Sequence, residues 1–342
     1  IDMNRPNHGT WSENVGATRM GRLAERRAEM QRRYANLDEA HEVTYGVATL
    51  SAPALTPEAP PPPAPPAPAV PGWPFDAAAA RAKQQALGAV TRALDLGGGV
   101  SLTLVRIPAG AYADADGRRV TIARPFWISA DEVTNEQYAR FDPQHDSFME
   151  RGEYMQFTPE ERGYPLNTPT QPVCRVSFDA ASAFCRYAAQ RSGLRVRLPS
   201  GGEWEWAARA GAATPMTYGG IDADFSAQAN LADAVFHKME RLRANMPGAA
   251  IPAWRPAVTN VSDGFRVSSP VGSFASNAWG LRDVHGNVWE WTADRLPDGR
   301  AVARGGSWWK RPRHATFAAR VPYAPWQQVY DVGFRVLVES DD

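Results

Sequence analysis

The sequence predicts a loop-rich α+β domain preceded by an extended N-terminal region. From about residue 100 onward, short strand-like runs are separated by long segments rich in Gly, Pro, Asn and Asp, and amphipathic helices interrupt them. The 342 residues include 29 Pro and 28 Gly, which indicates much irregular backbone. A hydrophobic content of 44% is still sufficient for a core.

Residues 1–52 are expected to form a polar arm. Apolar side chains recur at helical spacing within residues 17–39, but Arg27 interrupts the stripe and charged residues surround it. A lone helix of this length is marginal in water unless its apolar face packs on a surface. A frayed terminal helix and a docking arm for a partner protein both remain open.

Residues 53–75 are interpreted as a Pro-rich linker, because the run at 60–68 is typical of a semi-rigid polyproline II spacer. Asp76 is the expected N-cap of a helix over 77–87, a stretch of strong helix formers. The glycines at 97–99 end that region.

The main domain is predicted to span residues 76–342. Its expected strands are 101–107, 126–128, 173–177 and 333–338. Hydrophobic spacing and end signals predict three helices: 135–141 opened by Thr134, 179–191 stopped by Gly193, and the shorter 202–210.

Charge and composition exclude several classes of function. The 37 basic and 37 acidic side chains balance, so no net field attracts nucleic acid or an anionic membrane. No apolar run approaches the roughly 20 residues of a membrane span. The chain starts at Ile1, which fits a removed export signal or a truncated end, and we expect an extracytoplasmic location (periplasmic, secreted or cell-surface).

The cysteines and histidines show no metal-ligand spacing. Cys174 and Cys185 are expected in the core as small apolar side chains, although a disulfide between them stays open. The six histidines are interpreted as surface or hydrogen-bonded residues: His8, His41, His145, His237, His285 and His314.

Three signatures follow one another near the C-terminus: GNVWEWT at 286–292, RGGSW at 304–308 and GFRV at 333–336. Further segments precede them, namely LVRIPAG at 104–110, EVTNEQY at 132–138, QPV at 171–173, VSFDA at 176–180, LPSGGEWEWAAR at 198–209 and NAWGL at 277–281. This ordered set resembles the bacterial branch of the formylglycine-generating enzyme (sulfatase-modifying factor) family. The resemblance covers about three quarters of the chain and implies a C-type-lectin-like fold.

The tryptophans of these signatures are expected to be mainly core residues, because indoles bury large apolar areas. The pairs Trp204/Trp206 and Trp289/Trp291 have a spacing of two. In a helix this spacing places the rings on different faces, and in an extended segment it places them on one side. Trp308 and Trp309 are the candidates for an exposed ligand-stacking surface.

The resemblance implies one or two calcium ions. The family positions for one site correspond to Asn230, Leu231, Asp263 and Phe265, and those for a second to Asp283, Gly286, Val288 and Glu290. Carboxylates with backbone carbonyls are ligands that suit Ca²⁺. Turn-forming Asp and Asn side chains bonded to amides are the alternative interpretation.

Oxygen-activating members of the family bind copper(I) through two cysteines that follow the Gly-Gly-Ser motif, and soft thiolates suit that ion. Here Lys310 stands near the first position, and the second is missing from a shortened segment. Copper is therefore not expected, nor is formylglycine synthesis by that mechanism. The His-rich iron motif of the ergothioneine-type branch is also absent from the sequence.

A basic and aromatic strip occupies the place of the thiols. We call it the C-terminal face: Trp308, Trp309, Lys310, Arg311, Arg313, His314, Arg320, Tyr323, Trp326 and Tyr330. The family uses this region as a pocket or binding surface, and Arg, Trp and Tyr are enriched in protein-binding hot spots. A solvated rim over a core is the alternative.

Three hypotheses of function follow. The first is a non-catalytic, calcium-stabilised binding or structural subunit, with residues 1–50 and the C-terminal face meeting protein partners. The second is a divergent oxidoreductase acting on a peptide or small substrate, with Ser307, Arg320 and Trp289 lining its pocket. The third, a carbohydrate-binding lectin, ranks lowest because a Glu-Pro-Asn calcium loop is missing from the sequence.

Overall fold

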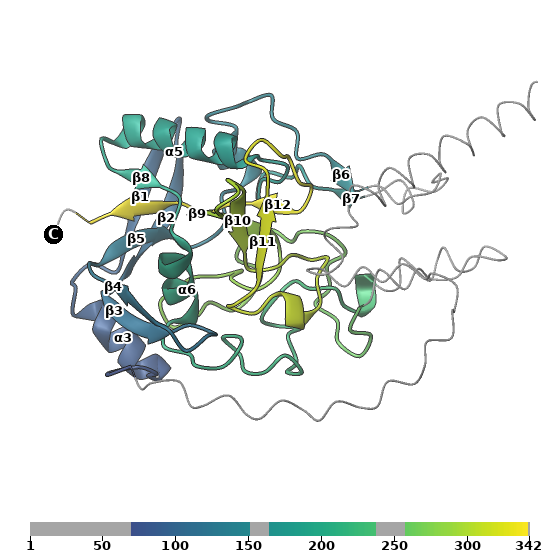
Figure 1. Ribbon diagram of the computed structural model, residues 1–342. Coiled ribbons are helices and arrows are strands. Elements are labelled where there is room, and N and C mark those ends of the chain that lie inside the picture. Colours follow the sequence, from purple (N-terminus) through teal and green to yellow (C-terminus); the bar gives the residue numbers. More distant parts are fainter. Residues whose placement is uncertain (1–69, 151–163, 237–256, 341–342) are drawn as a thin grey trace, which may run out of the picture. The chain divides into compact units, whose positions relative to one another are not determined.

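The computed structural model describes residues 70–150, 164–236 and 257–340. Figure 1 shows the arrangement of their helices and strands. The arm at 1–52 and most of the linker lie outside the described residues. In the described part, no helix has the length and apolar character needed to cross a bilayer. The helices are α3 (Ala77–Gln85), α4 (Asn135–Tyr138), α5 (Phe178–Ser192), α6 (Gly201–Arg209) and the 3-10 helix η3 (Pro312–His314).

The strands form two main sheets and two short hairpin-like pairs. The larger sheet has the order β1 (Thr91–Gly97), β2 (Val100–Ile107), β5 (Phe126–Ser129), β13 (Leu337–Glu339) and β8 (Val196–Arg197). The second has the order β11 (Arg320–Tyr323), β10 (Ala301–Arg304), β9 (Trp289–Arg295) and β12 (Val332–Gly333). The short pairs are β3 (Gly110–Ala113) with β4 (Arg119–Ile122), and β6 (Met149–Glu150) with β7 (Tyr164–Pro165).

The larger sheet is buried on both faces. In β2, Leu102 and Leu104 join the apolar cluster that contains α5, whereas Val105 and Ile107 join the one that contains α6. Alternation along a strand places successive side chains on opposite faces, so the two helices cover opposite sides of this sheet. Figure 1 shows α5 lying along the sheet near β1 and β8.

Local sequence explains where the helices begin and end. The predicted helices over 77–87, 179–191 and 202–210 are confirmed, with Asp76 capping α3 and Gly193 in a left-handed conformation ending α5. Thr134 caps α4 through a reciprocal bond with Gln137, as expected for a capping box. α4 ends at Tyr138, earlier than predicted.

Two strand predictions were wrong in detail. Residues 173–177 lie in no strand, because Val173 N–H bonds to Val133 and Arg175 N–H to Val329, in two different loops. The predicted strand over 333–338 is divided into β12 and β13. The first part pairs in parallel with β9, and the second joins the other sheet. The strand β1 was not predicted. It forms a hairpin with β2 around the glycines at 97–99.

The indole spacing behaves as predicted. Trp289 and Trp291 lie in the extended strand β9 and both join the cluster beside α5. Trp204 and Trp206 lie on α6 and bond in different directions: the first donates to Glu290 at 2.7 Å and the second to the Pro108 carbonyl at 2.7 Å. α6 is therefore buried on more than one side.

Glu205 of α6 carries a buried charge between two guanidinium groups. Its Oε1 accepts from Arg209 Nη2 at 2.7 Å, and its Oε2 accepts from Arg304 Nη2 at 2.5 Å. All three side chains are at least nine-tenths buried. This group fixes α6 against β10, because charges this deep need their partners.

We expect Glu205→Gln to lower the free energy of unfolding by about 3–5 kcal/mol, because two guanidinium groups would lose their shared counter-charge. Urea denaturation followed by circular dichroism measures this. The matched control is Glu136→Gln on α4, whose carboxylate is exposed, and its effect should stay within about 0.5 kcal/mol. Equal small effects of both variants would contradict a structural role for the buried charge.

Candidate functional site

The GNVWEWT motif surrounds a buried asparagine that joins separate loops. Asn287 has a φ of 54° and is 0% exposed, and its Nδ2 donates to Glu132 at 2.6 Å. Its Oδ1 accepts from Ser269 N–H at 2.9 Å and Asn230 Nδ2 at 3.2 Å. Glu132 also accepts from Val288 N–H at 3.0 Å. One side chain thus fixes three loops that no sheet connects.

Glu290 and Arg335 form an ion pair within the same motif region. Arg335 Nε donates to Glu290 Oε2 at 2.5 Å and Nη2 to Oε1 at 2.6 Å, while Trp204 Nε1 donates to the same carboxylate at 2.7 Å. Both charged side chains are 0% exposed. The carboxylate of Glu290 therefore has its counter-charge already.

The first predicted calcium set lies together in space. Asp263 accepts from Leu231 N–H at 2.8 Å through Oδ2 and from Phe265 N–H at 2.9 Å through Oδ1. Burial raises the pKa of Asp263 to about 7, and the neighbouring Asp233 carboxylate adds to this shift. Asn230 is 0% exposed, and its Oδ1 has no partner among the described residues.

An unpaired buried oxygen beside an unbalanced carboxylate suits a hard cation with oxygen ligands. The donor set at Asn230 and Asp263 therefore fits the ion that the resemblance implies.

The second predicted set fits less well. Asp283 accepts from Gly272 N–H at 2.9 Å, and its buried Oδ1 has no partner among the described residues. Burial raises the pKa of Asp283 to about 7. Glu290, however, is occupied by Arg335 and Trp204. Gly286 approaches the Asn230 carbonyl so closely that a Cβ would lie 2.0 Å from it, which explains the glycine at that position.

The residues of the C-terminal face differ in how deeply they are buried. Trp308 is 1% exposed and packs in a cluster with Cys174 and Val288, so its expected place on a contact surface was wrong. Trp309 is half-buried between Tyr330 at 5.4 Å and Phe236 at 5.3 Å, measured between ring centroids.

The remaining residues of the C-terminal face line the surface to different extents. Lys310, Arg311, His314 and Tyr323 are half-buried. Trp326 is 71% exposed and Tyr330 38%, and Arg313 and Arg320 are exposed. The surface that a partner can reach is therefore centred on the exposed members.

The segment from Ser307 to Lys310, which leads to the position of the family's first cysteine, contains hydrogen-bonded and charged groups. Ser307 Oγ donates to Asp331 Oδ2 at 2.7 Å, and Asp331 is 2% exposed. Burial raises the pKa of the Asp331 carboxyl, and the nearby Lys310 ammonium opposes that shift. A hydroxyl, a carboxylate and an ammonium thus occupy this region.

The two cysteines are free and buried. Cys174 packs in the cluster that contains Trp308, whereas Cys185 packs in the one beneath α5. Burial raises the pKa of Cys185 to about 12 and that of Cys174 well above its usual range. Both therefore carry protons at neutral pH, in separate surroundings.

The described residues contain no group of three or more His, Cys, Asp or Glu side chains arranged to hold a metal.

The described histidines are hydrogen-bonded, as predicted. His145 Nε2 bonds to the Cys174 carbonyl at 2.8 Å, and His314 Nε2 accepts from Arg313. His285 is 1% exposed; its Nδ1 donates to the Ala315 carbonyl at 2.7 Å and its Nε2 accepts from Thr217 N–H at 3.0 Å. His8, His41 and His237 lie outside the described residues.

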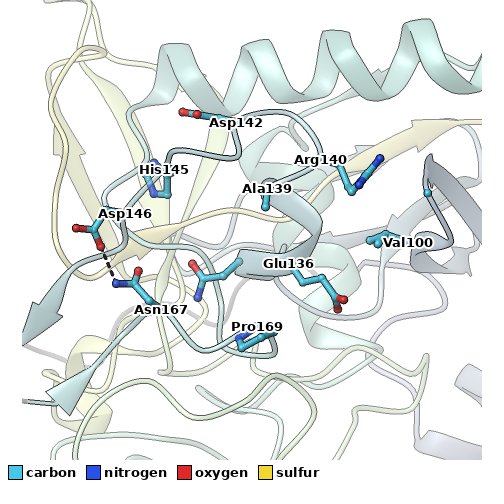
Figure 2. A pocket seen from close by; sticks show the side chains of 11 residues that line it. Val100, Glu136, Ala139, Arg140, Asp142, His145, Asp146, Asn167 and Pro169 are labelled. Atoms are coloured by element: carbon cyan, nitrogen blue, oxygen red, sulfur yellow. Dashed lines mark hydrogen bonds between the residues drawn. The ribbon is translucent and has the colours of Figure 1, made fainter.

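Two shallow hollows were not anticipated. The first, about 650 Å³, lies around α4 and combines carboxylates with a basic and an imidazole group (Figure 2). Figure 2 shows Glu136, Arg140, Asp142, His145, Asp146 and Asn167 around it. The second, about 410 Å³, is lined by Tyr164, Phe265, Arg266 and neighbours.

Neither hollow is lined by Ser307, Arg320 or Trp289, the residues of the enzyme hypothesis. Ser307 and Trp289 are almost completely buried.

Fold and buried motif together define a loop-rich, C-type-lectin-like α+β domain. The family model for the sulfatase-modifying factor enzyme 1-like domain matches residues 96–340. The chain belongs to this family.

Two relatives show the range of the family. The chain is 28% identical to the inactive C-alpha-formylglycine-generating enzyme 2 of Bos taurus over 267 residues, which cover 64% of this chain and 80% of that protein. It is 32% identical to the formylglycine-generating enzyme of Thermomonospora curvata over 159 residues, 46% of this chain and 41% of that enzyme. This match spans less than half of the enzyme's length.

Solved structures agree on the fold. PvdO from Pseudomonas aeruginosa aligns with a TM-score of 0.54 at 25% identity, covering 73% of this chain and 98% of that one. Treponema denticola variable protein 1 aligns with a TM-score of 0.55 at 19% identity, covering 74% and 100%. At the lower identity the likeness concerns the fold alone.

Sequence reasoning missed Glu132, Asn287, Asp233 and Asp331 as site residues. Glu132 and Asn287 stood inside quoted motifs without a role. Asp233 follows Asn230 by three residues, a short spacing of side-chain oxygens that was available as a signal. Asp331 gave no local signal, because its partner Ser307 lies 24 residues away.

His285 makes stability sensitive to acid. Burial lowers its pKa to about 4 from an unfolded value of about 6.5, so the unfolded chain takes up the proton first. Its contribution is complete above pH 6.5 and is lost as pH falls toward 4, at up to about 1.4 kcal/mol per pH unit. We expect His285→Gln to show a shallower loss of unfolding free energy than wild type between pH 7 and 5. Parallel slopes would contradict a neutral buried imidazole.

Proposed function

We propose that this chain is a non-catalytic, calcium-stabilised binding or structural subunit of an extracytoplasmic assembly, which meets its partner through the C-terminal face. The observation that carries the proposal is the placement of the two cysteines of the sequence, which do not lie where the family binds copper. Lys310 stands near the first cysteine position, and the two thiols are buried in separate clusters. Copper(I) favours paired thiolates, which this arrangement does not offer.

The similarity to known proteins also supports a non-catalytic role. The relative matched over most of its length is called inactive in its own name. The match to the formylglycine-generating enzyme of Thermomonospora curvata is shorter. Because one fold serves many functions, the absence of a thiol pair in this sequence weighs more than family membership.

Calcium is proposed at the loops that carry Asn230 and Asp263. Asn230 Oδ1, an Asp263 oxygen and the carbonyls of Leu231 and Phe265 would hold it. The ion supplies the positive charge that the buried Asp263 lacks, and it cross-links loops without ladder hydrogen bonds. Calcium modules outside the cytosol work with dissociation constants of about 10⁻⁴–10⁻³ M, which is compatible with an extracytoplasmic location.

The recognition surface is proposed to use the exposed part of the C-terminal face. Trp326 presents 71% of its surface, and Arg320 on the edge strand β11 is exposed. Trp and Arg contribute strongly to protein-binding hot spots because they bury large areas and donate several hydrogen bonds. Residues 1–50 are proposed as a second contact with the partner, on the basis of their sequence.

We expect calcium to raise the melting temperature of the wild-type protein relative to chelator, and Asp263→Asn to abolish this difference. At a calcium concentration 100 times the dissociation constant, the stabilisation is about 2.7 kcal/mol. The matched control is Asp298→Asn, an exposed carboxylate that also accepts a backbone N–H. A calcium effect that survives in Asp263→Asn would place the ion elsewhere.

We expect Trp326→Ala to reduce capture of the native partner about tenfold or more without changing the melting temperature, because the indole is exposed. Quantitative co-purification from the native host, with and without residues 1–50, provides the readout. Ile221→Ala is the control, since Ile221 is also an exposed apolar residue, at 41%. Unchanged capture by the Trp326 variant would remove this surface from the proposal.

A further inference from the structure

The loop that begins at Asn230 contains a second buried carboxylate with an unassigned role. Asp233 is 0% exposed. Its Oδ1 accepts from Phe236 N–H at 2.8 Å, and its Oδ2 accepts from the N–H of Asp263 itself at 2.8 Å. Asp233 therefore contacts the backbone of the residue whose carboxylate is proposed to bind calcium.

Asp233 and Asp263 each accept a backbone N–H from the segment that carries the other. Asp233 accepts the N–H of Asp263, and Asp263 accepts the N–H of Leu231, two residues before Asp233. Backbone bonds extend the connection, from Ala234 N–H to Val261 at 2.9 Å and from Val258 N–H to Ala232 at 2.8 Å. The position of the Asp263 carboxylate is thus fixed from both ends.

Among the described residues, the carboxylates of this region have no side-chain cation as a partner. No ion pair involves Asp233 or Asp263 within the described part of the chain, and no Arg or Lys is among the groups that act on Asp263. Buried carboxylates are normally paired with a cation, because an unbalanced charge is costly to bury.

Asn230 indicates independently that a ligand belongs there. Its Nδ2 donates to the Val267 carbonyl at 2.9 Å and to Asn287 Oδ1 at 3.2 Å, both of which are acceptors. This fixes the orientation of the amide, so the atom that has no partner among the described residues is the oxygen. An unpaired oxygen that is 0% exposed needs a donor or a cation.

We propose that Asp233 is a positioning residue for a divalent cation held by Asn230 and Asp263: it orients Asp263 through the backbone N–H and supplies the second negative charge of the site. This inference rests on the proposed calcium site. Two carboxylates match the charge of Ca²⁺, so the site should prefer a divalent cation over Na⁺ or K⁺. Outer carboxylates of this kind change metal affinity because they orient the ligands that touch the ion.

The test is calorimetric titration of CaCl₂ into chelator-treated full-length protein, in wild type and in Asp233→Asn. We expect a loss of calcium affinity of about 10- to 100-fold in the variant, as is usual for outer-shell partners. The matched control is Asp224→Asn. Asp224 is an exposed aspartate that also accepts a backbone N–H, from Ser226 at 2.9 Å, and its affinity should remain that of wild type.

Melting temperatures separate positioning from simple structural support. We expect Asp233→Asn to be less stable than wild type in both conditions, because its amide nitrogen would face one of the two N–H groups that Asp233 accepts. The loss should be larger in calcium, so that calcium raises the melting temperature of the variant less than that of wild type. If Asp233→Asn does not fold, Asp233→Ser, which is smaller and retains an acceptor, should show the same loss of affinity.

Three results would overturn the proposal. Wild-type affinity in Asp233→Asn would show that Asp233 does not act on the ion. Equal destabilisation in calcium and in chelator would assign it a purely structural role. Absence of calcium binding by wild-type protein would overturn the calcium site itself, and this outcome is distinct from the first two.

Discussion

The buried ion pair between Glu290 and Arg335 is the interaction on which the described part of this domain depends most. Glu290 belongs to β9 of one sheet, and Arg335 lies between β12 and β13, where the chain passes to the other sheet. Arg335 also donates to the carbonyls of Ser129 and Ala130 at the end of β5, and to that of Arg282. A single guanidinium thus joins both sheets to a loop.

This arrangement explains why the motifs are rich in polar residues although they are buried. A loop-rich fold has few ladder hydrogen bonds, so side chains must satisfy the backbone groups of its interior. Asn287 accepts the backbone N–H of Ser269 and Glu132 accepts that of Val288, and Asn287 also accepts from the side-chain amide of Asn230. Calcium at Asn230 and Asp263 would continue the same principle where no side-chain cation of the described part is available.

The region after the Gly-Gly-Ser motif contains hydrogen-bonded and charged groups. Ser307 bonds to Asp331, and the Lys310 ammonium acts on that carboxylate. His285 attaches the shortened segment at Ala315. These groups hold backbone and balance charge, and none of them is a soft ligand. Beyond them, Arg320 and Trp326 are exposed on the surface.

Sequence alone predicted the fold, α3, α5 and α6, because caps and hydrophobic spacing are local signals. It failed for residues 173–177, where an apolar run is buried by loops instead of a ladder, and for β1, which depends on its pairing with β2 and its packing against α5. Placing Trp308 on the surface failed because burial depends on the cluster with Cys174 and Val288, which come from distant segments. Asp331 and Asp233 likewise acquire roles through contacts 24 and 30 residues away.

Anomalous diffraction from crystals grown in calcium, with data collected on both sides of the copper absorption edge, tests the central claim most directly. We expect one peak beside Asn230 Oδ1 and Asp263 that is the same on both sides of the edge, and no peak at Lys310. A copper-dependent peak beside Lys310 or Cys174 would contradict the claim and assign redox chemistry to this chain.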